Sequence, residues 1–123
     1  MIIGTGIDII ELKRFERVFL KFGDVLIKKI FNYDEVPARK NKNKFIATLA
    51  GKFAAKEAIS KALGSGIGKK LRFKEISILN ETSGKPFAKI DRYNLENIHI
   101  SISHSNDNAC LLYTSPSPRD SIR

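Results

Sequence analysis

Two carboxylates and one lysine stand out because each lies among apolar or small residues. Asp8 falls inside an isoleucine-rich run, Glu57 follows Phe53 by four residues, and Lys61 lies one helical turn beyond Glu57. A carboxylate beside a buried face has to be paired or bound to a metal ion. The same spacing also suits a surface salt bridge, since Glu before Lys at i,i+4 is the favourable order. Asp8 could likewise cap a following helix rather than bind a ligand. Both interpretations stay open at this point.

The element that positions Glu57 and Lys61 is a long helix predicted from residues 45 to 66. Large apolar residues recur at Ile46, Leu49 and Phe53, and Ala or Gly fills many of the other positions at the helical period. Small side chains allow another backbone to approach closely, so we expect this helix to pack into the body of the protein. Gly64 is the predicted C-terminal stop.

The element that positions Asp8 is a strand predicted over residues 2–10. The next stretch, 11–22, has an apolar stripe of helical spacing formed by Leu12, Phe15, Phe19 and Phe22. A second stripe is positively charged, and we call it the basic face: Arg14, Arg17 and Lys21. It is either a solvated surface or a docking surface for an acidic partner.

Two further helices are predicted before the long one. Residues 24–31 suggest a short helix begun by Asp24, and residues 32–35 resemble the cap and first turn of a third, with Pro37 near its start. The polar run 40–44 carries three lysines and leads into the long helix. It is either a solvated loop or, because a helix N-terminus also favours anions, a phosphate site. The Gly-rich loop 65–70, with two lysines, is a second and weaker phosphate candidate, since it lacks the Walker A pattern.

The second half of the chain is rich in strand patterns. Residues 74–80 and 86–90 predict a hairpin, 99–105 alternates as a half-buried strand, and 109–113 begins a last strand. A fold of the α+β class is therefore expected, in one domain spanning residues 1–113. The tail, 114–123, changes composition abruptly, and we expect it to be disordered and non-native.

Composition restricts the class of protein. The chain has 123 residues, a net charge of +9 and a single cysteine, Cys110, which cannot form an internal disulfide. No apolar run reaches the roughly 18 residues of a membrane span, and the N-terminus lacks the layout of a signal peptide. We therefore expect a soluble cytoplasmic protein with an acidic partner. Basic charge also suits a small RNA-binding protein, which tight RNA binding in a filter assay would identify. Against that alternative, the chain has no RNP-like aromatic pair and no helix-turn-helix pattern.

Four blocks in order, GIDIIELKRF, KFAAKEAISKALGSGIG, SGKPF and SISHS, resemble the holo-acyl-carrier-protein synthases of the 4′-phosphopantetheinyl transferase superfamily. The resemblance spans residues 1–112 and implies a long central helix packed on an antiparallel sheet. It implies transfer of 4′-phosphopantetheine from coenzyme A to a serine of acyl carrier protein, releasing adenosine 3′,5′-bisphosphate. It also implies a homotrimer with active sites between subunits, and no nucleic-acid partner.

The resemblance assigns roles to individual residues. Asp8 and Glu57 become ligands of Mg²⁺, whose preference for hard oxygen ligands fits two carboxylates, and Lys61 becomes the cation beside the pyrophosphate. The basic face becomes the docking surface for the carrier protein, which is acidic. The general base stays open among a metal-bound water, Asp34 and Glu35. The residues implied to hold the coenzyme A phosphates and adenine end, besides Lys61, are Lys44, Lys52, Gly64, Ser65, Gly66, Ser103, His104 and Ser105.

Overall fold

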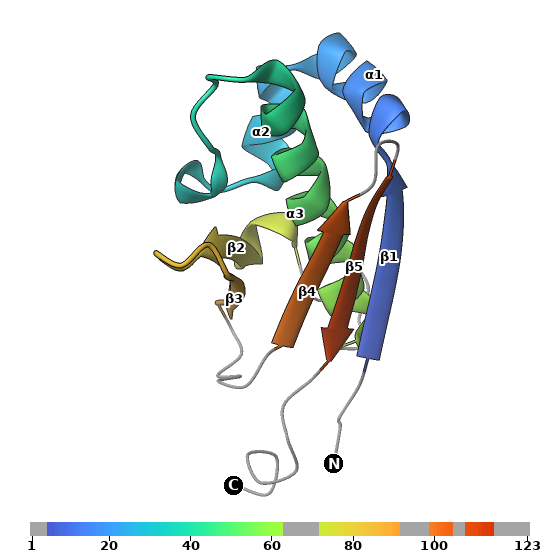
Figure 1. Cartoon of the computed structure of the whole chain (residues 1–123). Helices are drawn as coiled ribbons and strands as arrows, with labels where there is room; N and C mark the ends of the chain where they lie inside the picture. Colours follow the sequence, from blue (N-terminus) through green and yellow to red (C-terminus); the bar gives the residue numbers. More distant parts are fainter. Residues whose placement is uncertain (1–4, 63–71, 92–98, 105–107, 115–123) are drawn as a thin grey trace, which may run out of the picture.

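The computed structural model describes residues 5–62, 72–91, 99–104 and 108–114. In these ranges, the other helices and the strands are arranged around one long helix, α3 (Figure 1). The side chains of residues 5–9, 62, 99, 101, 103, 104 and 108–114 lie outside the description. In chain order the elements are β1 (Thr5–Glu11), α1 (Leu12–Phe22), α2 (Asp24–Ile30), the 3-10 turn η1 (Tyr33–Glu35), α3 (Lys42–Ala62), the 3-10 turn η2 (Phe73–Glu75), β2 (Ile76–Asn80), β3 (Pro86–Ile90), β4 (His99–His104) and β5 (Asn108–Thr114).

The strands form two antiparallel sheets, which confirms the predicted α+β class. β5 lies between β1 and β4, so the three-stranded sheet joins the first strand to the last two. In its register Asp8 is opposite Leu111, and Leu111 is opposite Ile102. The predicted hairpin is β2–β3. Its turn needs Gly84, whose φ of 93° lies in the left-handed region that other residues rarely adopt.

The core consists of two clusters arranged along α3. Near its N-terminus, Phe45, Ile46 and Leu49 pack against α1 and α2. Near its C-terminus, small residues and Ile59 pack against the hairpin, with Ile100 and Ile102 of β4 at the margin. α1 and α2 accordingly gather around one end of α3 while the strands cover the other end (Figure 1). The two halves of the long helix thus pack against different elements.

The third predicted helix is wrong: only the 3-10 turn η1 forms. Asn32 caps it, and the side chain of Glu35 accepts from the Asn32 main-chain N–H at 2.8 Å. The helix cannot continue because Pro37 disfavours helical geometry at Val36, which is extended with ψ of 118°.

The start of α3 and the burial of the apolar stripe of α1 also differ from prediction, and residues 74–75 belong to η2 rather than to the strand β2. α3 begins at Lys42 rather than Phe45, because Asn41 caps it: its side-chain oxygen accepts from the Lys44 N–H at 3.1 Å. The apolar stripe of α1 is buried at Phe15, whereas Phe22 at its end is 50% exposed. Gly23, with φ of 52°, ends α1 there and starts α2 in a new direction. Among the described residues, the helices lack the combination of length and apolarity needed to cross a membrane.

Candidate active site

α3 is the element on which most of the candidate residues lie. Its 21 residues present different faces to different neighbours, and both β1 and β5 pack against it. Ala50, Ala54 and Ala58 are completely buried. Such small side chains explain how a sheet can pack closely along the helix. Of the predicted site residues on α3, Lys44 and Lys61 are exposed and Glu57 is half-buried.

Glu57 and Lys61 lie one turn apart on α3, as predicted. Glu57 is half-buried, Lys61 is exposed, and each takes part in a polar or electrostatic contact. Asp8 belongs to β1, which packs against α3, and it stands two residues before Ile10, which packs against both core clusters. The structure therefore brings together the two elements that carry the predicted metal ligands. The side chain of Asp8 lies outside the described residues.

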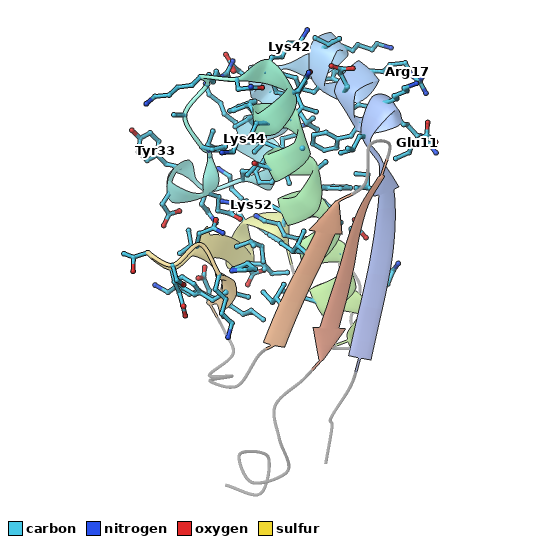
Figure 2. The ribbon with its side chains drawn as sticks, in the orientation of Figure 1. Glu11, Arg17, Tyr33, Lys42, Lys44 and Lys52 are labelled. Atoms are coloured by element: carbon cyan, nitrogen blue, oxygen red, sulfur yellow. The ribbon has the colours of Figure 1, made fainter. Side chains whose placement is uncertain are left out.

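Lys44 and Lys52 lie on another side of α3 (Figure 2). Lys44 is beside the segment 37–41, and Lys52 is nearer the hairpin. Lys44 lines a hollow of about 440 Å³ between α3 and the segment 37–41. Lys52 lines a second hollow of about 220 Å³, whose far wall includes Asn80, Gly84 and Pro86 of the hairpin. Thr48 belongs to both hollows, so the two adjoin along this side of α3. We call the surface that they form the strip.

α3 itself separates the two groups of candidate residues. Glu57 follows Lys44 by 13 positions, which on an ideal helix is roughly 20 Å along the axis and about 140° around it. Lys52 and Lys61 are about 180° apart by the same geometry. One chain therefore presents the two lysines of the strip and the Glu57–Lys61 pair on different sides of one helix.

The remaining candidates for coenzyme A contacts are only partly described. Ser103 and His104 form the end of β4. They follow Ile102, which lies in the same cross-strand row as Leu111 and Asp8. Gly64, Ser65, Gly66 and Ser105 lie outside the described residues, as do the predicted helix end at Gly64 and residues 115–123 of the tail.

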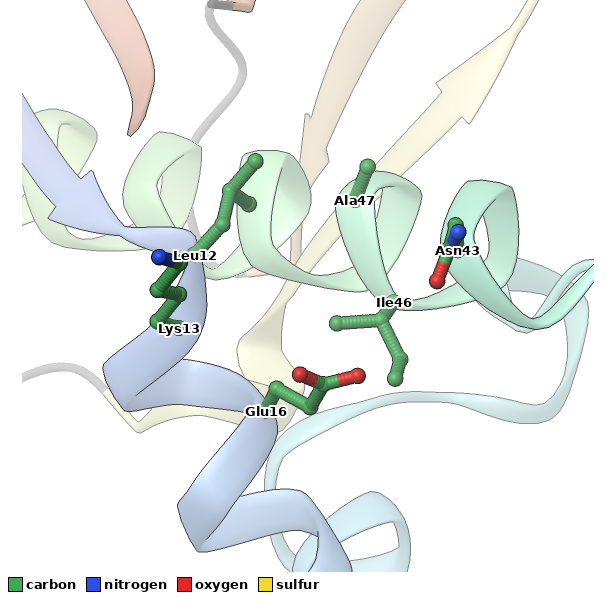
Figure 3. A pocket seen from close by; sticks show the side chains of 6 residues that line it. All are labelled: Leu12, Lys13, Glu16, Asn43, Ile46 and Ala47. Atoms are coloured by element: carbon green, nitrogen blue, oxygen red, sulfur yellow. The ribbon is translucent and has the colours of Figure 1, made fainter. Parts of the chain in front are cut away.

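The basic face lies on exposed positions of α1, as predicted. Arg14, Arg17 and Lys21 are all exposed, and Figure 2 shows Arg17 directed away from the body of the protein. Beside this helix a hollow of about 280 Å³ separates α1 from α3 (Figure 3). Lys13 and Glu16 border it on one side and Asn43 on the other. Exposed Val18 and Phe22 accompany the charges on α1, so the surface offers both cations and apolar contact.

A buried ion pair, which was not predicted from the sequence, joins α3 to η1. Lys56 and Glu35 are both fully buried and their charged atoms are 2.7 Å apart. The Lys56 ammonium also donates to the main-chain oxygens of Ile30 at 2.6 Å and Phe73 at 3.0 Å. Glu35 accepts in addition from the main-chain N–H of Ile78 at 2.8 Å. The network joins α2, η1, α3, η2 and β2.

Lys52 belongs to the margin of this network. Its side chain is almost completely buried and its ammonium donates to the main-chain oxygen of Glu35 at 2.6 Å. Burial lowers the pKa of Lys52 below its ordinary value of 10.5, and the carboxylates of Glu35 and Asp34 oppose that shift. Burial lowers the pKa of Lys56 too, opposed chiefly by its hydrogen bond to Glu35. The geometry thus gives Lys52 a structural contact, and its predicted phosphate contact stays a prediction.

The two carboxylates considered as general bases differ sharply in placement. Glu35 has no exposed surface, and its two oxygens are occupied by Lys56, Asn32 and Ile78. It cannot reach the hydroxyl of another molecule in this position. Asp34 is exposed but lies on η1, beside a hollow bounded by α2 and the segment 36–38.

Comparison with known proteins gives a consistent result along the chain. The family model described as the 4′-phosphopantetheinyl transferase superfamily matches residues 4–114. A holo-[acyl-carrier-protein] synthase of Geobacillus sp. (strain WCH70) is 46% identical over 116 residues, covering 89% of this chain and 92% of the relative. The holo-[acyl-carrier-protein] synthase of Staphylococcus haemolyticus (strain JCSC1435) is 44% identical over 108 residues, covering 85% and 88%.

Solved structures agree in fold. A crystal structure of a holo-(acyl-carrier-protein) synthase from Bacillus anthracis str. Ames, in complex with CoA (3′,5′-ADP), has a TM-score of 0.83 and 38% identity. That comparison covers 95% of this chain and 98% of the other. The Helicobacter pylori holo-[acyl-carrier-protein] synthase in complex with coenzyme A has a TM-score of 0.79 and 32% identity, covering 91% of this chain and 99% of that one.

Proposed function

The chain belongs to the 4′-phosphopantetheinyl transferase superfamily, and on this premise we propose that it is a holo-[acyl-carrier-protein] synthase. It transfers 4′-phosphopantetheine from coenzyme A to a serine of apo-acyl carrier protein. The serine oxygen forms a bond to the phosphorus that bears pantetheine, the pyrophosphate bond breaks, and adenosine 3′,5′-bisphosphate leaves. The serine proton passes to a base.

The observation that carries this proposal is the match of the superfamily model to residues 4–114. A relative that is 46% identical, and of which 92% is covered, supports it. The match extends from β1 to β5, and the solved structures of relatives with bound coenzyme A share the fold. It favours a transferase over the RNA-binding alternative, which rests on net charge alone.

We assign the phosphoryl chemistry to Asp8, Glu57 and Lys61. Their types suit it, because transfer concentrates negative charge on phosphoryl oxygens and cations must neutralise that charge. Two carboxylates on packed elements fit Mg²⁺, which takes one or two carboxylates and completes its shell with water and phosphate oxygens. When bound, Mg²⁺ supplies electrostatic stabilisation of the pyrophosphate oxygens. Glu57 and Asp8 would hold the ion, and Lys61 would lie against the leaving phosphate.

We assign coenzyme A binding to the strip along α3 and to the glycine-rich and β4 ends. Lys44 lies at the N-terminus of a 21-residue helix, where the helix dipole adds to its positive charge. The hollows beside Lys44 and Lys52 provide concave surface for the adenosine end of the molecule. The other residues in this assignment are Gly64, Ser65, Gly66, Ser103, His104 and Ser105.

We propose that each active site is shared by two chains of a homotrimer. The support is the separation of the two groups by α3: one chain turns Glu57 and Lys61 to one side and the strip to another. A second copy would bring its strip to the first copy's Glu57. A closed ring of such unlike contacts repeats the same site at every interface.

We propose that the basic face receives the carrier protein. The carrier protein is acidic, so its charge complements the three exposed cations on α1. Complementary charge of this kind accelerates and orients the encounter of two proteins more than it strengthens their binding. We also propose a cytoplasmic location, which the single cysteine favours because disulfides are rare in that reducing compartment.

Incubation with apo-acyl carrier protein, coenzyme A and Mg²⁺, followed by intact-mass measurement, tests the function. The carrier should gain the mass of one phosphopantetheine group, and the gain should disappear with a carrier whose target serine is replaced by alanine. No gain with the wild-type carrier would refute the proposal.

A further inference from the structure

The ammonium of Lys56 has a complete set of partners. A protonated lysine has three N–H donors, and three acceptors lie around this one: Ile30 O at 2.6 Å, Glu35 Oε1 at 2.7 Å and Phe73 O at 3.0 Å. The acceptors come from α2, η1 and η2, three separate elements. Lys56 is also the largest fully buried side chain among the described residues.

This contact lies where α3 has few other side chains to fix its orientation. Around Glu57, the buried positions Ala54, Ala55 and Ala58 face the strands and hairpin. Alanines pack closely but interlock little, because they form no ridge that fits a groove. Larger residues such as Leu49 fix the N-terminal half of the helix. From its middle onward, α3 has mainly Lys52, Phe53, Lys56 and Ile59 as larger buried or half-buried side chains.

We propose that Lys56 is a positioning residue for the transfer reaction: its three hydrogen bonds fix the rotation and axial position of α3, and thereby the placement of Glu57 and Lys61. The inference rests on the proposed function. Lys56 touches no substrate, since it is fully buried. Glu57 is the next residue in the helix, so any rotation at Lys56 is transmitted to it directly.

A small rotation is enough to matter. Side-chain tips on a helix lie about 5–6 Å from its axis, so a turn of roughly 20° would move a carboxylate by about 2 Å. Mg²⁺ requires near-ideal octahedral geometry at about 2.1 Å. A misplacement of about 1 Å in an active site costs on the order of 100-fold in rate.

The first test removes both buried charges together, because removing one alone would leave the other unpaired. In the double variant Lys56→Met/Glu35→Gln, Gln has the length of Glu, and Met is an unbranched neutral side chain one atom shorter than Lys. We expect a folded protein with kcat lowered roughly 10- to 100-fold, an unchanged KM for the carrier protein, and weaker binding of Mn²⁺ measured by electron paramagnetic resonance without substrates. The matched control is Ile90→Ala, which empties core space in β3, and it should lose stability while keeping kcat and Mn²⁺ affinity.

The outcomes separate the two proposals. If the wild type transfers nothing, the proposed function fails and this inference fails with it. If the wild type is active and the double variant matches Ile90→Ala in both kcat and Mn²⁺ affinity, only the positioning role is refuted.

A second test asks whether the ammonium itself is needed. Lys56→Cys in a Cys110→Ser background leaves one thiol, which can be alkylated in denaturant and refolded. An aminoethyl group restores a lysine-like cation, and a propyl group gives a neutral chain of the same length. We expect the aminoethyl protein to recover most of kcat and the folded propyl protein not to. Equal recovery would overturn the proposal, and if the propyl protein does not fold, the double variant decides.

Discussion

Glu35→Gln should destabilise the protein far more than the loss of a surface ion pair of the same length. The chain provides a matched comparison: Lys56–Glu35 is 2.7 Å long and fully buried, whereas Arg39–Asp24 is 2.8 Å long with side chains 57% and 75% exposed. Removing one partner of a buried pair costs about 3–5 kcal/mol, because the remaining charge is left unpaired. Removing one partner of an exposed pair costs about 0.2–1 kcal/mol. Asp24→Asn is therefore the control.

The loss of unfolding free energy that Glu35→Gln causes, relative to the wild type, should shrink as pH rises. Burial already lowers the pKa of Lys56 from 10.5 and Glu35 opposes that shift, so Glu35→Gln lowers the pKa further. In the variant, the folded protein then releases the Lys56 proton at a pH where the unfolded chain still holds it. The unfolded state binds more protons in that window, so the stability of the variant rises with pH and is lost as pH falls through the folded pKa.

Urea unfolding followed by far-ultraviolet circular dichroism measures these free energies, since the chain has no tryptophan to report by fluorescence. Each protein is unfolded near pH 7 and near pH 9.5. A loss below about 1 kcal/mol for Glu35→Gln near pH 7, equal to that of Asp24→Asn, would refute the reasoning. So would a gap between variant and wild type that widens at the higher pH.

Three further outcomes are expected. Glu57→Gln should remove nearly all transfer, measured by intact mass, while its urea midpoint stays near the wild-type value; near-normal turnover would contradict the metal assignment. Reversing the charges of the basic face should raise KM for the carrier protein but not for coenzyme A, by a factor that falls with added salt, and equal loss for both substrates would argue against docking there. Lys44→Ala and Glu57→Ala proteins, each inactive alone, should regain about a quarter of the active sites when they are unfolded and refolded together at equal amounts. In a random trimer, about one interface in four joins a chain with an intact Lys44 to a neighbour with an intact Glu57 in the required order. No recovery in a mixed trimer would exclude a shared site.

The elements of the fold could be predicted because their patterns are local. The apolar spacing of Leu49 and Phe53 and the small residues around them identify α3. Alternation identifies β2 and β4, and the turns that follow these strands in the sequence identify β3 and β5. The start of α3 is harder to predict because the run 40–44 has the polar composition of a loop, although Asn41 is a residue type that commonly caps helices. The helix predicted after residues 32–35 failed because the effect of Pro37 on Val36 outweighs a favourable first turn.

The candidate site was harder to predict where partners are distant in sequence. Glu35 and Lys56 are charged residues of types that are seldom buried. Local sequence patterns do not indicate an ion pair between residues 21 positions apart. One signal was available: Lys56 follows Leu49 by seven and Phe53 by three, which puts it on their buried face. The separation of Lys44 from Glu57 around α3 also follows from spacing, but its meaning depends on which elements cover each side.

The position of β5 between β1 and β4 has a consequence for biosynthesis. β1 and β4 do not pair with each other, so the three-stranded sheet cannot close until the strand Asn108–Thr114 has been synthesised. At about 5–20 residues per second, roughly 3–10 s pass between the end of α3 and the end of β5. During that interval α1, α2 and α3 can already bury their shared aromatic cluster, while β1 has an unpaired edge, the kind of surface on which chains aggregate. Sheet closure thus waits for the C-terminal strand, and we expect chains stopped before residue 108 to be the aggregation-prone species that chaperones bind.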